Sequence, residues 1–196
     1  MLTRRQLIAG AGAGGAALLT TGCGPVRPPL RTFTYSVATK GAIRTSLDEF
    51  IRNAGATLSA RQGWALGGSV AYRRVPSGGD FTLWLCEARL VPSFSSVCSS
   101  LYSCRVGRDV VINQDRWISG TSTWPLGLDE YRHYVVNHEV GHWLGLSHWA
   151  SPGPGRLCPV MFQQSKGITD GSLYNTWPLA DERRAVASRF GVPIWP

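Results

Sequence analysis

The sequence is organised around the stretch Asn137-His138-Glu139-Val140-Gly141-His142-Trp143-Leu144-Gly145-Leu146-Ser147-His148, which has the spacing H-E-x-x-H-x-x-G-x-x-H. Two histidines four positions apart on a helix are separated by about 40° around the axis and roughly 6 Å along it, so both rings can reach one metal ion. Gly145 can adopt the left-handed conformation that ends a helix in a sharp turn. That turn would bring His148 back as a third ligand beside His138 and His142.

Three neutral imidazoles with an open fourth position are typical of a catalytic zinc site rather than a closed structural one. We therefore expect Zn²⁺ as the cofactor, a zinc-bound water as the nucleophile and Glu139 as the general base. The alternative is a helix with ordinary surface histidines, but three of the four histidines in the chain fall within the motif. The fourth, His133, is one position out of step with His138, and we interpret it as a structural or surface residue.

This stretch resembles the signature of the metzincin zinc metalloproteases. The resemblance implies that Met161, in Cys158-Pro159-Val160-Met161, belongs to a methionine-containing turn that forms an apolar floor under the zinc. Over about residues 31–178 the chain is similar, more specifically, to an uncharacterised actinobacterial family of exported metzincin-like proteins. That similarity rests on Asn137-His138-Glu139-Val140-Gly141-His142, Pro152-Gly153-Pro154-Gly155-Arg156, Pro159-Val160-Met161, Gln163-Gln164 and Trp177-Pro178.

The resemblance implies an α+β fold of the metzincin type. Its parts would be a mixed twisted sheet, an N-terminal helix and an active-site helix, then the methionine turn and a C-terminal helix. Residue patterns predict strands over 32–37, 69–75, 81–86 and 108–113, and helices over 44–61, 129–144 and 179–190. Because the 196-residue chain is 43% hydrophobic and only 16% charged, it can bury one normal core, and we expect residues 31–196 to form a single domain.

A strand at the edge of the cleft receives substrate in metzincins by pairing backbone to backbone. The residues Val110, Val111, Ile112 and Asn113 are our candidate for that strand. An ordinary core strand is the alternative.

Residues 1–23 have the features of a targeting segment. Arg4 and Arg5 precede an apolar run to Leu19, and Leu18-Leu19-Thr20-Thr21-Gly22-Cys23 is similar to a lipoprotein cleavage site. We expect an exported, cell-surface lipoprotein that is acylated on Cys23, with simple cleavage and secretion as the alternative. The paired arginines fit twin-arginine export and are also compatible with Sec export. Residues 24–30 form a proline-rich tether.

Cysteine spacing predicts disulfides, since an even number of cysteines in an exported domain is typical of bridges. Four remain in the domain: Cys86, Cys98, Cys104 and Cys158. Cys98 and Cys104 flank a short serine-rich loop, and the similar family has cysteines at these places. In that family a second pair brackets the methionine turn, where Ser151 and Ser172 stand here. We therefore expect a Cys86–Cys158 bridge as a substitute, with free buried thiols as the alternative.

Together these features predict a zinc-dependent endopeptidase that acts outside the cytoplasm on peptide or protein substrates. A non-catalytic zinc-containing surface module and a peptidoglycan amidase are the alternatives; Glu139 favours an enzyme, because a binding module needs no base beside its ligands. The net charge of +8 is scattered, which fits solubility and loose attraction to anionic envelope polymers. We expect a monomer without nucleic-acid partners that reaches the membrane only through a lipid on Cys23.

Overall fold

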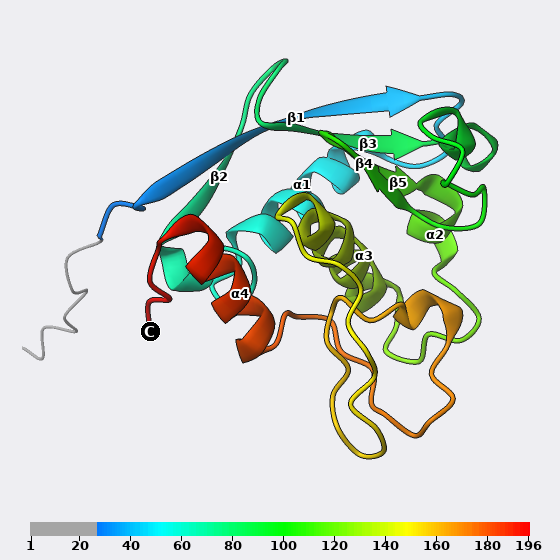
Figure 1. Cartoon of the computed structure of the whole chain (residues 1–196). Helices are drawn as coiled ribbons and strands as arrows, with labels where there is room; N and C mark the ends of the chain where they lie inside the picture. The colour runs from blue at the N-terminus through cyan, green and yellow to red at the C-terminus, as the bar shows by residue number, and fades with distance from the viewer. Residues whose placement is uncertain (1–26) are drawn as a thin grey trace, which may run out of the picture.

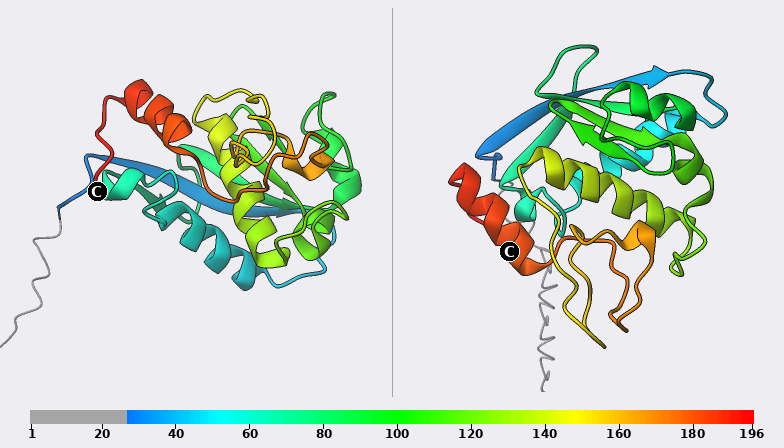
Figure 2. Two further views of the ribbon diagram at one scale, coloured as in Figure 1. Left: turned by 90° about the horizontal axis from the view of Figure 1, so that it is seen from below. Right: turned by 45° about the vertical axis from the view of Figure 1, so that its right-hand side comes forward.

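The computed structural model describes residues 27–196. The predicted targeting segment, the lipidation candidate Cys23 and the first residues of the tether lie outside the described residues. A twisted sheet forms one layer, and the two long helices α1 (Leu47–Ser59) and α3 (Leu128–Trp143) pack together against one face of it (Figure 1). The two further views in Figure 2 show the same layering.

The sheet is mixed, as expected. Its strands follow the order β2-β1-β3-β5-β4. Their bounds are Arg31–Lys40 for β1, Val70–Arg74 for β2, Phe81–Cys86 for β3, Cys104–Val106 for β4 and Asp109–Asn113 for β5. The strand pairs β1–β2, β1–β3 and β3–β5 are parallel, and only β4 runs antiparallel to its neighbour β5. The predicted α+β class with a mixed sheet is confirmed.

The helices begin and end where local chemistry allows. The side chain of Ser46 accepts a hydrogen bond from the Glu49 backbone N–H at 3.2 Å and so caps α1. The last helix, α4 (Ala180–Phe190), ends at Gly191 in the left-handed conformation. A six-residue helix that the sequence did not predict, α2 (Gln114–Ser119), directly follows β5. Within residues 27–196, no helix is both long and apolar enough to cross a bilayer.

Short 3-10 helices connect these elements. They are η1 (Leu66–Gly68), η2 (Ala88–Ser93) and η3 (Gln164–Lys166). The first precedes β2, the second covers the segment after β3, and the third follows the methionine turn.

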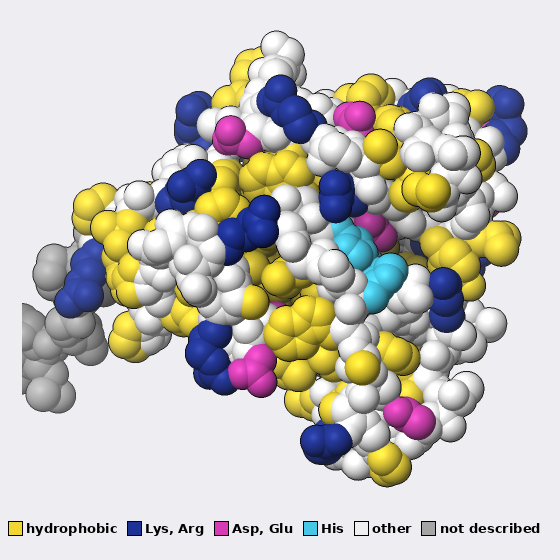
Figure 3. All heavy atoms as spheres, viewed as in Figure 1, with side chains coloured by type: hydrophobic (Ala, Val, Ile, Leu, Met, Phe, Trp, Pro, Cys, Tyr) yellow, Lys and Arg dark blue, Asp and Glu magenta, His cyan; other side chains and the backbone are white. Residues whose placement is uncertain are grey.

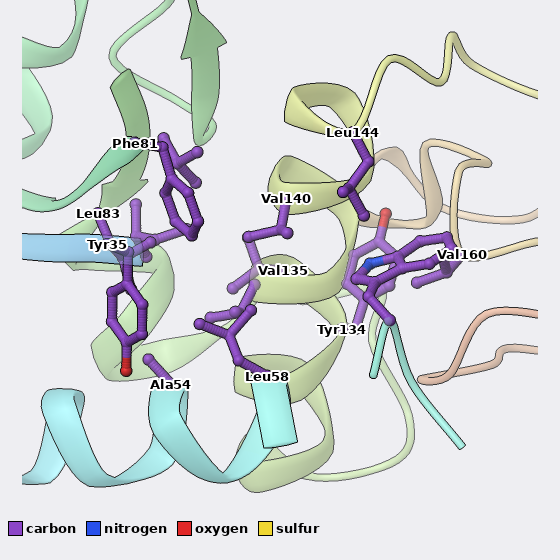
Figure 4. Close-up of a cluster of buried hydrophobic side chains, with 14 of the residues drawn as sticks. Tyr35, Ala54, Leu58, Phe81, Leu83, Tyr134, Val135, Val140, Leu144 and Val160 are labelled. Carbon is purple, nitrogen blue, oxygen red and sulfur yellow. The ribbon is translucent and has the colours of Figure 1, made fainter. Parts of the chain in front are cut away.

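The main core lies between the sheet and its helices. Figure 4 shows Phe81 and Leu83 of β3 facing Val135 and Val140 of α3, with Leu58 of α1 nearby. The opposite side of α3 is covered as well, by the segment that follows it, so the helix is buried on most sides. A helix buried in this way must find partners for its polar side chains, and α3 buries Asn137, His138 and Glu139.

A second, smaller core lies on the other face of the sheet. It contains Cys86, Val91, Cys98 and Val111. Side chains alternate between faces along a strand, so Leu83 and Leu85 join the main core while Trp84 and Cys86 contribute to the smaller one.

Two expectations about the cysteines have different outcomes. The Cys98–Cys104 disulfide is present, with the two Cα atoms 5.8 Å apart. The expected Cys86–Cys158 bridge is wrong, since both residues are buried free thiols. The reason is the sheet itself: Cys86 packs in the smaller core, whereas Cys158 lies beside Ser151 in the segment that follows α3.

The expected substrate strand is also wrong. Val110, Val111, Ile112 and Asn113 belong to β5, which pairs with β3 on one side and β4 on the other. All four residues are completely buried. The edge of the sheet on this side is instead β4, a strand of only three residues.

Candidate metal centre

The structure brings His138, His142 and His148 together. One ring nitrogen of each lies within 4.8 Å of the corresponding atoms of the other two, and the Nε2 atoms of His142 and His148 are 3.1 Å apart. The turn at Gly145 makes this possible: its φ of 96° requires glycine, and the Leu146 N–H donates back to the Gly141 carbonyl at 3.0 Å. The three histidines therefore form a group that can hold a metal ion.

Backbone carbonyls orient two of these rings. His138 Nδ1 lies 2.8 Å from the Val160 carbonyl oxygen, and His142 Nδ1 lies 2.9 Å from the Leu146 carbonyl oxygen. Since a carbonyl can only accept, each Nδ1 carries the hydrogen and each Nε2 keeps a free lone pair toward the centre. This arrangement is typical of histidine ligands.

Burial keeps the histidines neutral. It lowers the pKa of His138 to about 3, and it lowers the pKa of His142 and of His148 as well. Metal binding requires unprotonated imidazole, so the three rings are in the binding form at neutral pH. A set of three neutral imidazoles fits Zn²⁺ by donor type and number.

Met161 lies directly beneath the motif helix and is completely buried. A Cβ placed on Gly141 would clash with the Met161 sulfur, and it would lie 3.1 Å from the Trp64 ring. The Trp64 indole in turn donates to the Asn137 carbonyl at 2.9 Å. Gly141 thus allows the methionine turn to approach the helix between its two histidines.

Glu182, a completely buried carboxylate of α4, holds the methionine turn. It accepts hydrogen bonds from the backbone N–H groups of Val160 at 3.0 Å, Met161 at 2.8 Å and Leu179 at 2.7 Å. The backbone of Val160 therefore connects Glu182, through its N–H, to His138, through its carbonyl oxygen. Sequence reasoning missed this residue. Its position in the first turn of a predicted helix indicates that Glu182 can cap the start of that helix, but it does not indicate the further bonds to the methionine turn.

Glu139 faces the cleft beside the histidines. It is only 5% exposed, and within residues 27–196 no hydrogen bond or ion pair occupies its carboxyl group. Burial raises the pKa of Glu139 to about 8, while the charge of Arg105 acts in the opposite direction. The carboxyl group is thus free to bond to a water molecule or a substrate.

A cleft of about 470 Å³ opens over these residues. The 3-10 helix η3 borders it on one side, and the edge strand β4 with the disulfide-closed loop before it borders it on the other. In Figure 3 the histidine side chains are visible in the hollow, with cationic side chains near them. The cleft lining includes His138, Glu139, His142, His148, Tyr102, Arg105, Gln163 and Lys166.

The fourth histidine lies outside this group. His133 Nδ1 is 2.7 Å from the Thr57 hydroxyl of α1, and its ring lies beside Trp177. Trp149, directly after the third histidine, donates its backbone N–H to the Met161 carbonyl at 3.2 Å. The segment that carries His148 is therefore bonded to the methionine turn.

The molecule has an α+β fold in which three histidines that can hold a metal ion lie on and after one buried helix, above a turn that contains Met161. The chain belongs to the family described as "Protein of unknown function (DUF3152)", which matches residues 18–187. The solved structure of archaemetzincin from Methanopyrus kandleri is similar, with a TM-score of 0.48 and 11% sequence identity, covering 85% of this chain and 99% of that one. No curated protein sequence matches the chain.

Proposed function

We propose that this protein is a zinc-dependent endopeptidase that acts outside the cytoplasm. One observation carries the proposal: Glu139, whose carboxyl group has no hydrogen-bond or ion-pair partner within residues 27–196, lies beside three cleft-facing imidazoles. A structural metal site would need no such carboxyl group and no open cleft. The resemblance of the motif to the metzincin signature supports the same reaction class.

Each residue has a definite role in this chemistry. Zn²⁺ held by His138, His142 and His148 would supply Lewis acidity, which polarises a scissile carbonyl and makes water more acidic. Glu139 accepts the proton of the attacking water and then donates it to the leaving amine. Among residues 27–196, the buried carboxyl group of Glu139 is the one acidic side chain that lines the cleft, so it is the group placed to carry this proton.

The position of the edge strand β4 favours a peptide as the substrate. It is the last strand of the sheet on this side, it pairs with β5 only, and it borders the cleft. The backbone groups on its outer side are available to pair with an extended peptide, which β4 would hold across the histidines. This strand takes the role that the sequence had placed on residues 110–113.

The proposed location and partners follow from the sequence. Residues 1–23 support export, with a lipid on Cys23 as the membrane anchor or release as the alternative. The Cys98–Cys104 disulfide fits an oxidising compartment. We propose a monomer that acts on peptides or proteins of the cell envelope.

The test uses purified protein with casein, short peptides and purified cell wall as substrates. Wild-type protein is expected to hold one zinc and cleave peptides; Glu139→Gln should keep zinc and lose hydrolysis by about 10²–10⁴-fold. His142→Ala should lose the metal, and His133→Ala, outside the centre, should keep it. Zinc without hydrolysis of any substrate would favour a binding module, and cleavage of cell wall alone would favour an amidase.

A further inference from the structure

The cleft has cationic side chains that the proposed chemistry does not use. Cys104 and Val106 pack with the smaller core, so alternation along β4 directs Arg105 to the opposite face, where it lines the cleft. Its Nε is buried without a hydrogen-bond partner, and none of the ion pairs within residues 27–196 includes it. A buried guanidinium donor without a partner costs stability unless a ligand satisfies it.

Arg105 lines the same cleft as the reacting groups. Glu139 and His142 border that cleft with it, and Glu139 is only 5% exposed. No ion pair joins Arg105 to Glu139 in the described part of the chain, so the guanidinium is not neutralised there. A substrate group bound to Arg105 would therefore lie close to the scissile bond.

A second cation, Lys166, also lines the cleft. Lys166, at the end of η3, lines both the main cleft and an adjoining pocket of about 170 Å³. That pocket also contains Arg116, whose Nε is buried without a hydrogen-bond partner, and the hydroxyl groups of Thr121, Ser122 and Thr123. Among the residues that line the two cavities, Glu139 is the only acidic one.

We infer that the site selects peptides with an aspartate or glutamate side chain close to the scissile bond, and that Arg105 and Lys166 recognise that carboxylate. The inference rests on the proposed function and adds a substrate class to it. Arginine suits this role because its planar guanidinium can bind a carboxylate through two parallel hydrogen bonds. Lys166 contributes an exposed point charge near the Tyr102 ring, 5.9 Å away, in the loop before β4, and this charge also attracts acidic segments in solution.

The first experiment measures binding, so it does not depend on turnover. Full-length Glu139→Gln protein is titrated with fluorescent peptides blocked at both ends, each carrying one Glu or, in the matched peptide, one Gln. We expect the best Glu peptide to bind on the order of tenfold more tightly than its Gln counterpart, because a charge-assisted hydrogen bond to a carboxylate is stronger than a neutral one to an amide. Adding Arg105→Gln or Lys166→Gln should reduce that ratio toward one.

A matched variant separates recognition from net charge. Arg52 is exposed on α1, outside both cavities, so Arg52→Gln removes the same charge. It should leave the Glu-to-Gln ratio unchanged. If Arg52→Gln reduces the Glu-to-Gln ratio as much as Arg105→Gln does, the protein attracts polyanions in general and the inference is overturned. The same conclusion follows if inorganic polyphosphate competes with the Glu peptide and Arg52→Gln weakens that competition too. A third peptide, the Gln peptide with its C-terminus left free, tests for a terminal carboxylate. If it binds as tightly as the blocked Glu peptide, the site recognises a C-terminus and the inference is overturned.

The second experiment compares kcat/KM for the same blocked peptides with wild-type protein. The Glu peptide should be favoured by a similar factor, and Arg105→Gln should remove the preference; a merely structural role for Arg105 would slow both peptides equally. Cleavage without a preference would refute the inference and leave the endopeptidase proposal intact. Selective binding without cleavage would refute the endopeptidase proposal and leave carboxylate recognition intact.

Discussion

At the scale of single residues, the candidate centre depends on the absence of a side chain at Gly141. The residue lies on α3 between His138 and His142, and the space where its Cβ would be is taken by the Met161 sulfur. Because both the helix and Met161 are buried, neither can move without disturbing its neighbours. The Val160 carbonyl that orients His138 belongs to the same turn.

We expect Gly141→Ala to destabilise the fold, although alanine favours helix by about 1 kcal/mol over glycine. Overpacking of a filled core costs about 1–3 kcal/mol, and here it would also displace the acceptor of His138 and weaken zinc binding. Chemical denaturation and zinc titration measure the two effects. Gly55→Ala in α1 is the control, because its Cβ would meet only the Tyr35 hydroxyl at 3.6 Å. Equal stability of the two variants would contradict this account.

At the scale of elements, the segment after α3 is held in place by polar contacts more than by regular structure. Its two arms are joined by backbone hydrogen bonds, among them Cys158 N–H to Leu173 O at 2.8 Å and Leu173 N–H to Arg156 O at 2.8 Å. Glu182 then fastens the methionine turn to α4. An irregular segment can be positioned this closely only when its backbone groups are satisfied.

Replacing Glu182 by glutamine tests this fastening. The amide NH₂ group cannot accept a hydrogen bond, so at least one backbone N–H at Val160, Met161 or Leu179 would lose its acceptor. We expect a loss of about 1–3 kcal/mol in the free energy of unfolding, together with weaker zinc binding. Glu130→Gln on the exposed first turn of α3 is the control. If zinc affinity is unchanged in a folded Glu182→Gln protein, then Glu182 does not position His138.

A second test concerns Ser151 and Ser172, whose side chains lie next to each other in the segment after α3. Their hydroxyl oxygens are 2.7 Å apart, and Ser172 also donates to the Gly153 carbonyl at 2.9 Å. We expect the paired substitution Ser151→Cys with Ser172→Cys to form a disulfide and stabilise the protein by roughly 2–4 kcal/mol.

The measurement is thermal unfolding with and without reductant. Cys158→Ala must be included in all samples, because the Cys158 sulfur is 3.9 Å from the Ser151 hydroxyl and would compete for the new thiol. The increase in melting temperature should disappear on reduction, while the Cys158→Ala protein alone provides the baseline. A disulfide that forms without raising the melting temperature would indicate strain at this position.

At the scale of the whole molecule, the sheet divides the chain into two compartments. The main core and the candidate centre lie on one face, and the smaller core with Cys86 lies on the other. The segment formed by β4 and the disulfide-closed loop before it packs with the smaller core and also borders the cleft. This separation is why the two free cysteines cannot meet.

We expect Cys86 and Cys158 to react with alkylating reagents only after unfolding. Both thiols are buried, and burial raises the pKa of Cys86 to about 11 and that of Cys158 above its ordinary value, so little thiolate is present at neutral pH. Alkylation before and after denaturation, followed by peptide mapping by mass spectrometry, measures each site. Cys98 and Cys104 should become reactive only with reductant. A Cys86–Cys158 peptide, or rapid labelling of either thiol in folded protein, would contradict this arrangement.

The features that depend on local chemistry were predictable from the order of the residues. Helical spacing placed His138 and His142 on one face, and the glycine at 145 predicted the turn that returns His148. Residue patterns predicted β3 to the residue and β2 and β5 to within one residue at each end, but gave only residues 32–37 for β1, which spans Arg31–Lys40. These features arise from contacts within a few positions of each other along the chain. The Cys98–Cys104 pair, six residues apart, belongs to the same group.

Three features could be found only in the folded chain: the strand at the edge of the sheet, the cysteines that share a face of the sheet, and the contacts that support the methionine turn. Strand order is set by how long segments pack across the sheet, and a three-residue strand such as β4 has no pattern of its own. Glu182 reaches Val160 and Met161 from 21 or 22 positions away. Burial of a charged group is stable only where several distant backbone donors converge, and that convergence exists only once the chain has folded.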